Sequence, residues 1–260
     1  MEKLYYSSTL MWGASPQQIL FRAARAGVAG LEIWAQQADT FGWQPEMLGE
    51  LARRAGLELL VHAKSWDLNF AALNEGVRRA SLEELKRSLE FASRCGAGEM
   101  TLHPPRFTLP GLKAMAMESG ARGLEELLDT AQGLGIEISL EVMEKLPKEL
   151  VTTPEEYRAF TGDLLPRLSC TLDLAHCQNE GEFWDYLSRL PRISKLHISN
   201  KQGKKLHTPL AQGDFNFLWL MPRLQKLDLP LVIEGFDGDG RFEILKSDLE
   251  LCQIQEEKDA

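Results

Sequence analysis

The chain has 260 residues, of which 44% are hydrophobic and 26% are charged, and its formal net charge is -9. These values are typical of a globular protein and argue against a disordered or membrane-spanning chain. The acidic balance disfavours a nucleic-acid partner, because a nucleic-acid interface normally needs a clustered basic surface.

The apolar runs of the chain end well before the roughly 18 residues that a membrane span needs. Residues 1–6 read MEKLYY and contain no apolar signal segment. We therefore expect a cytoplasmic protein without a membrane partner. The four cysteines form no CxxC motif and predict no disulfide framework.

Short apolar segments alternate with amphipathic segments along the chain. We predict strands at residues 4–9, 30–34, 57–63, 99–103, 136–143, 168–173, 194–199 and 230–236. We predict helices that begin near residues 15, 45, 75, 119, 153, 180, 215 and 241. The first helix has Ser15 and Pro16 at its start and Gly27 at its end, which are common helix boundaries. Residues 104–118 and 200–214 are predicted to be loops.

Eight strand-helix units in a row predict an α/β fold with a parallel sheet. The length is close to the roughly 250 residues of a (β/α)8 barrel, so we predict a single TIM barrel domain over residues 1–260. An open doubly wound sheet is the weaker alternative. No GxGxxG motif follows the first strand to support a dinucleotide-binding fold.

Side chains that can bind a metal stand at the ends of most of the predicted strands. These residues are His62, His103, Glu141, Asp173, His176, His197 and Glu234, and His207 follows ten residues after His197. A single histidine on a buried strand is usually a hydrogen-bonded core residue. A whole set of buried imidazoles and carboxylates is costly without a shared partner, and in a barrel these strand ends form the functional face. The pattern therefore predicts a divalent-metal site.

The order of these residues resembles the xylose isomerase-like barrel superfamily. That superfamily joins sugar isomerases and epimerases to the endonuclease IV class of apurinic-site nucleases, also called AP endonuclease family 2. In the epimerases a Glu, an Asp, a His and a Glu hold one metal, and the residues in matching order are Glu141, Asp173, His197 and Glu234. The resemblance also implies that His176 contacts substrate. In the nuclease branch further histidines complete a three-zinc cluster, and His62, His103 and His207 match them.

The chain departs from both branches at one position each. Lys205 stands where the nucleases have an aspartate ligand, so KLH replaces DxH, and we expect a third metal position to be incomplete. Gly203 stands where the epimerases commonly carry an arginine. The ligand types and the two branches together imply Zn²⁺ or Mn²⁺ as cofactor. The expected number is one to three ions per chain.

The favoured function is a metal-dependent isomerase or epimerase that acts on a sugar or sugar phosphate by proton transfer through an enediolate. Glu141 and Glu234 would carry the proton on opposite faces of the substrate. Residues placed to contact substrate are His176, Trp12, Trp34 and Trp66 for the sugar and Lys201, Lys204 and Lys205 for a phosphate. The alternative function is a zinc-dependent phosphoester hydrolase related to endonuclease IV. A third hypothesis is a barrel that binds metal or sugar without catalysing a reaction. The sequence leaves the oligomeric state open, a homodimer included.

Overall fold

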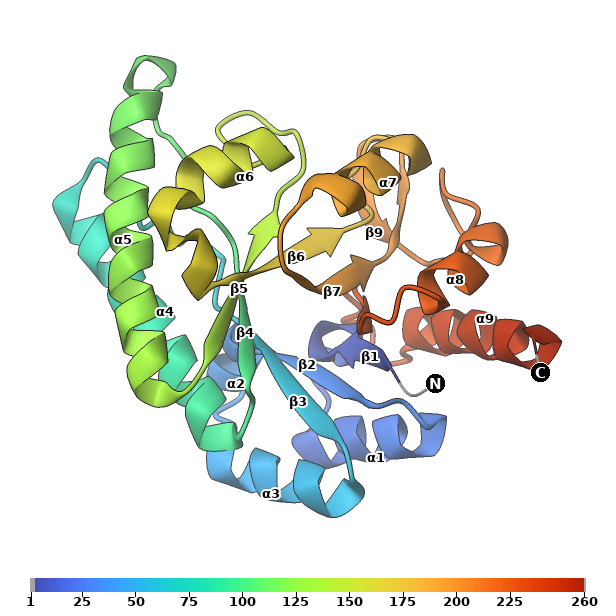
Figure 1. Cartoon of the computed structure of the whole chain (residues 1–260). Helices are drawn as coiled ribbons and strands as arrows, with labels where there is room; N and C mark the ends of the chain where they lie inside the picture. The colour runs from blue at the N-terminus through green and yellow to red at the C-terminus, as the bar shows by residue number, and fades with distance from the viewer. Residues whose placement is uncertain (1–2, 260) are drawn as a thin grey trace.

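Eight parallel strands form the closed barrel that the sequence predicted (Figure 1). The structure is a computed structural model that describes residues 3–259, with side chains described as far as residue 253. The strands follow the order β1-β10-β7-β6-β5-β4-β3-β2 around the barrel. They are β1 (Leu4–Ser7), β2 (Gly30–Trp34), β3 (Glu58–His62), β4 (Glu99–Leu102), β5 (Glu137–Val142), β6 (Ser169–Asp173), β7 (Ile193–Ile198) and β10 (Leu231–Ile233).

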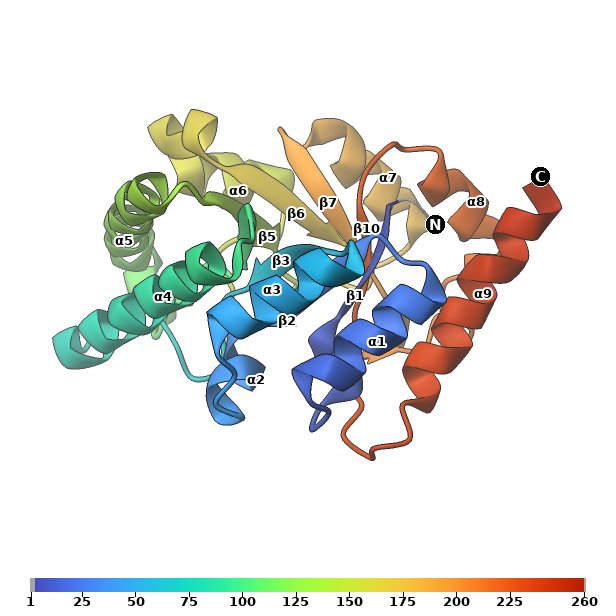
Figure 2. The ribbon, with the colours of Figure 1, turned by 90° about the horizontal axis from the view of Figure 1, so that it is seen from below.

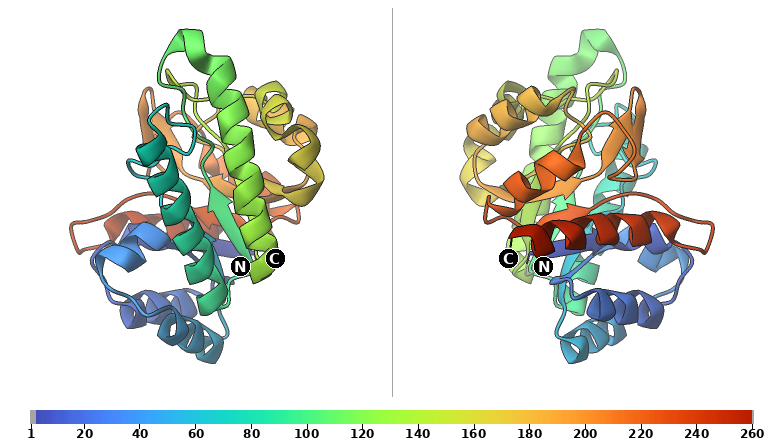
Figure 3. Two further views of the ribbon diagram at one scale, coloured as in Figure 1. Left: turned by 90° about the vertical axis from the view of Figure 1, so that its left-hand side faces the viewer. Right: turned by 90° about the vertical axis from the view of Figure 1, so that its right-hand side faces the viewer.

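Helices surround the strands on the outside of the barrel, as Figures 2 and 3 show. The α-helices are α1 (Pro16–Ala26), α2 (Ala35–Thr40), α3 (Pro45–Ala55), α4 (Glu75–Cys95), α5 (Lys113–Leu134), α6 (Pro154–Thr161), α7 (Glu180–Arg189), α8 (Phe217–Gln225) and α9 (Glu243–Asp259). Short 3-10 helices lie at η1 (Ser8–Met11), η2 (Pro110–Leu112) and η3 (Gly162–Arg167). Within residues 3–259, no helix combines the length and the apolar composition required to cross a bilayer.

Local signals explain why the helices begin and end where they do. At the start of α1, the Ser15 hydroxyl accepts the backbone N–H of Gln18, and the Gln18 side chain accepts the backbone N–H of Ser15. Gly27 ends the helix with a φ of 68°, a conformation that glycine adopts at little cost. The apolar faces of the helices pack against the strands in one continuous core.

The two segments predicted to be loops contain regular structure. Helix α5 begins at Lys113 and not near residue 119, because the expected loop 104–118 ends in helical turns. The expected loop 200–214 contains the antiparallel hairpin β8 (Asn200–Gln202) and β9 (Lys205–Thr208).

A buried asparagine organises the hairpin segment, which is why the apolar pattern does not reveal it. The Asn200 side-chain amide donates to the carbonyls of Leu210 and Phe215, and its oxygen accepts the backbone N–H of Phe215 at 3.0 Å. Gly213 allows the close approach, because a Cβ there would overlap the carbonyl of Lys201. The hairpin brings His207 over the mouth of the barrel.

Candidate metal centre

Four of the predicted ligands meet at the C-terminal mouth of the barrel. Ligand atoms of Glu141, Asp173, His197 and Glu234 all lie within 4.8 Å of one another. Glu141 lies on β5, Asp173 on β6 and His197 on β7, and Glu234 directly follows β10. All four side chains are buried. The parallel strands end at the same rim, and this is why residues far apart in sequence share one point.

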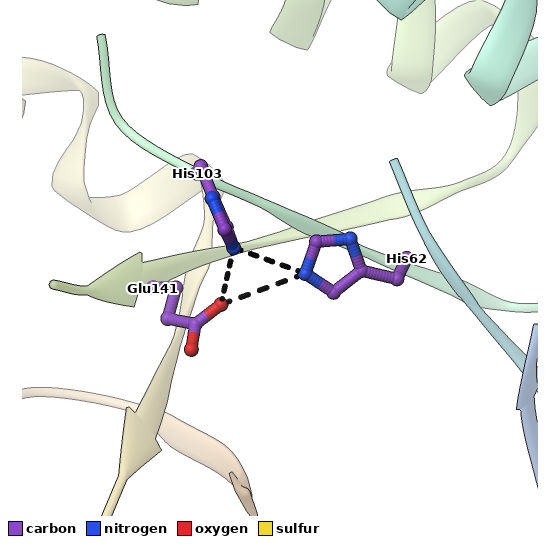
Figure 4. Close-up of side chains that lie close together, drawn as sticks. All are labelled: His62, His103 and Glu141. Atoms are coloured by element: carbon purple, nitrogen blue, oxygen red, sulfur yellow. Dashed lines mark hydrogen bonds and ion pairs between the residues drawn. The ribbon is translucent and has the colours of Figure 1, made fainter. Parts of the chain in front are cut away.

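His62 and His103 form a second group with Glu141 (Figure 4). The two Nε2 atoms are 3.1 Å apart, and Nε2 of His103 is 3.2 Å from the Glu141 carboxylate. The Nδ1 of His62 lies 2.8 Å from the carbonyl oxygen of Ala63, so Nδ1 carries the proton in the neutral ring. Its Nε2 therefore presents a lone pair toward His103 and Glu141, as a metal ligand would.

Asp173, His176 and His207 form a third group at the other side of the mouth. The Nδ1 of His176 donates to the Val142 carbonyl at 2.9 Å, which leaves its Nε2 facing Asp173 at 3.4 Å. His207 has a φ of 53°, a strained value for a residue other than glycine. The structure thus places His62 and His103 beside Glu141 and His207 beside Asp173, whereas the side chain of Lys205 is exposed on β9.

Several buried polar atoms at the mouth have no hydrogen-bond partner among the described residues. They include one carboxylate oxygen each of Glu141, Asp173 and Glu234 and both ring nitrogens of His197. Such atoms are costly in a folded protein unless a ligand satisfies them. Three carboxylates and an imidazole nitrogen are a donor set that suits zinc or manganese. The residues therefore fit a divalent cation.

The charges of the metal-free site hold several pKa values far from their ordinary range. Burial acts to raise the pKa of Glu141, but His197 and His103 hold it well below the usual value. Burial also acts to raise the pKa of Glu234, and His197 again lowers it. Burial raises the pKa of Asp173 to about 6, against the attraction of His176. At neutral pH these carboxylates are ionised and available to a cation.

Glu32 is a buried residue at this site that the sequence analysis did not single out. Its Oε2 is 3.1 Å from Nε2 of His197, although the N–H direction is not aligned with the oxygen. Its Oε1 accepts the hydroxyl of Thr101 at 2.6 Å. Burial acts to raise the pKa of Glu32, but His197 and Lys195 lower it to about 2. The available signal was a glutamate inside the apolar strand GLEIW.

A cavity of about 670 Å³ opens above these groups. Glu141, Glu234, His103, His176 and His207 line it, together with Trp34, Trp66, Arg106, Glu144 and Phe236 among others. Trp66 and Phe236 are 46% and 52% exposed, so they form an open aromatic rim.

The other predicted substrate residues lie outside this lining. Trp12 packs against the two rim residues, with its ring centroid 5.3 Å from that of Trp66 and 5.3 Å from that of Phe236. The Lys201 amine is buried against the carbonyl of Cys177, and Lys204 and Lys205 are exposed at the hairpin. The sequence analysis did not anticipate Phe236 or Arg106.

Known proteins resemble this chain in sequence and in fold. The uncharacterized protein MJ1311 of Methanocaldococcus jannaschii is 27% identical over 201 residues, which span 74% of this chain and 66% of that protein. A probable endonuclease 4 of Acholeplasma laidlawii is 24% identical over 59% of this chain and 57% of its own length. The chain thus spans about two thirds or less of the length of these two relatives.

One solved structure is that of a D-tagatose 3-epimerase-like protein. It superposes with a TM-score of 0.80 and 23% identity, and the match covers 99% of this chain and 100% of that one. The family model described as xylose isomerase-like TIM barrel matches residues 20–254. The chain therefore belongs to the xylose isomerase-like TIM barrel family.

Proposed function

We propose that the protein is a divalent-metal-dependent isomerase or epimerase of a small sugar. The observation that carries this proposal is the placement of two glutamates from different strands, Glu141 and Glu234, at the same nitrogen of one buried imidazole. Nδ1 of His197 is 3.3 Å from Glu141 and 3.2 Å from Glu234, and both carboxylates line the cavity. The fold similarity to a D-tagatose 3-epimerase-like protein supports the same reaction class.

The two glutamates give the site a proton carrier on each side of a bound sugar. One carboxylate takes the proton from the carbon beside the substrate carbonyl, and the electron pair of that C–H bond becomes the C=C bond of the enediolate. The opposite glutamate, after taking up a proton from solvent, returns that proton to the same carbon from the other face and becomes a carboxylate again. Exchange with solvent resets both groups. A bound divalent cation would polarise the carbonyl and stabilise the developing oxyanion.

The cavity favours an uncharged sugar over a sugar phosphate. Arg106 is the one Arg or Lys among the described residues that line it, and the guanidinium is paired with the buried Glu149 at 2.5 Å. The lysines expected to hold a phosphate lie elsewhere. Trp34, Trp66 and Phe236 offer apolar surface of the kind that packs against the C–H face of a sugar ring.

Hydrolysis of a phosphoester is the second candidate function. The groups built on His62 and His103 and on His176 and His207 favour it, because a reaction at a phosphate commonly uses two or more metal ions. Partial similarity to a probable endonuclease 4 supports the same direction. The acidic cavity weighs against a DNA substrate, which would need basic contacts along its backbone.

Deuterium exchange from solvent into ketoses tests the proposal. The wild type should incorporate deuterium at the carbon beside the carbonyl. Glu141→Gln and Glu234→Gln should each lower the rate by about 100-fold or more at equal metal content, because Gln keeps an oxygen ligand but accepts no proton. Glu125→Gln, an exposed change on α5, is the matched control. Absence of exchange with a broad ketose panel, together with cleavage of a model phosphodiester, would replace the proposal by the hydrolase.

A further inference from the structure

We propose that Glu32 is the positioning residue of the cation site, and that Thr101 and Lys195 hold it in place. The proposal rests on the cation site described above but not on the sugar chemistry. Among the described residues, Glu32 is neither part of the cavity lining nor a member of the three ligand groups. Its action is through His197.

The two ring nitrogens of His197 face different carboxylates. Nδ1 faces the carboxylates of Glu141 and Glu234 at 3.3 and 3.2 Å, whereas Nε2 faces Glu32 at 3.1 Å. A neutral imidazole carries its proton on one nitrogen and a lone pair on the other. An ionised carboxylate beside Nε2 favours the proton there, so Nδ1 keeps its lone pair for a cation.

Glu32 reaches this histidine from another wall of the barrel. It lies on β2, which β1 and β10 separate from β7. Small changes in the direction of this side chain would therefore move its oxygen off the imidazole. Thr101 on β4 fixes the carboxylate by donating its hydroxyl to Oε1 at 2.6 Å, which leaves Oε2 for His197.

Lys195 supplies the charge that a buried carboxylate needs. It lies two residues before His197 on β7, so both side chains point into the barrel. Its amine is 3.9 Å from Oε1 of Glu32 and forms an ion pair with Glu99. Lys195 is almost fully buried, and a lone ammonium there would be as costly as a lone carboxylate. Lys195 therefore pairs with Glu99 and also places a positive charge near the carboxylate of Glu32.

Zinc binding to the whole protein tests the proposal without an activity assay. The metal is removed with a chelator, and the zinc dissociation constant is measured by competition with a chromophoric chelator. Glu32→Gln keeps the size of the side chain but removes its charge, and should weaken zinc binding by about 10- to 100-fold. In the zinc-loaded protein, the Nε2–H proton of His197 should move upfield in the NMR spectrum, because its acceptor is no longer a carboxylate.

A matched pair of buried hydroxyl deletions provides the control. Thr101→Val removes the hydrogen bond to Glu32 and should weaken zinc binding about fivefold, which corresponds to one ordinary hydrogen bond. Thr171→Val makes the same change on β6, where the hydroxyl is 2.6 Å from that of Ser139, and should leave zinc binding within about twofold. This pair decides the question if Glu32→Gln does not fold.

The outcomes separate this inference from the proposed function. Zinc affinities of Glu32→Gln and Thr101→Val that equal the wild-type value would overturn the positioning role and leave the cation site intact. A wild type that binds neither zinc nor manganese would instead remove the cation site and the proposed function with it. In the double variant Glu32→Gln/Thr101→Val, a loss of zinc affinity no larger than the loss in Glu32→Gln alone would support action of Thr101 through Glu32.

Discussion

Replacing Asp248 with Asn tests how helix α9 holds the segment that carries His207. Asp248 is 1% exposed, and its Oδ1 accepts the backbone N–H of Leu210 at 2.8 Å, just beyond hairpin strand β9. No lysine or arginine of the described residues pairs with it. Burial raises the pKa of Asp248 to about 7, although the Leu210 N–H and the Ser247 hydroxyl act to lower it.

The raised pKa of Asp248 makes the folded protein prefer the neutral acid. The stability linked to this group is fully present below the unfolded pKa of 3.8 and is lost as the pH rises through about 7. A difference of roughly three pKa units corresponds to about 4 kcal/mol at pH 8. Asn cannot ionise and keeps an oxygen for Leu210. The Asp248→Asn variant should therefore be more stable than the wild type, by about 2–3 kcal/mol more at pH 8 than at pH 5.

Urea unfolding of both proteins at pH 5 and pH 8 measures this difference. Asp163→Asn, an exposed change within η3, controls for the general effect of removing one negative charge. At pH 8 the variant should also melt higher by roughly 10 °C, given the usual shift of 2–4 °C per kcal/mol for a chain of this size. An advantage of Asp248→Asn that is equal at the two pH values would refute the reasoning.

Two further predictions concern metal content. Zinc at about 100 times its dissociation constant should stabilise the chelator-treated protein by about 2.7 kcal/mol and raise its Tm by roughly 5–10 °C, and an unchanged Tm would contradict a site in the folded state. Lys205→Asp should raise the zinc content by about one ion per chain in elemental analysis, because a carboxylate then stands two residues before His207. Three tightly bound zinc ions in the wild type would show that Lys205 does not disable the third position.

The sequence by itself was sufficient to predict the barrel and the principal candidate ligands. Eight strand-helix units of similar length have few other ways to bury their apolar strands. The strand ends of a barrel share one rim, so the position of Glu141 or Glu234 in its own strand already placed it at the mouth. These predictions depend on local pattern and on a general property of the fold.

Tertiary structure alone decided which side chains meet across the barrel. Glu32 looked like one residue of an apolar strand, and only the closure of the sheet brings it to His197. The same holds for Arg106 and Glu149, which pair between two loops far apart in sequence. Contacts of this kind depend on the register and tilt of strands that are not neighbours in the chain, and no local pattern encodes them. The sequence pattern also did not predict the hairpin that carries His207. Hydrogen bonds from the side chain of Asn200 stabilise this segment, and it has no alternation of apolar residues.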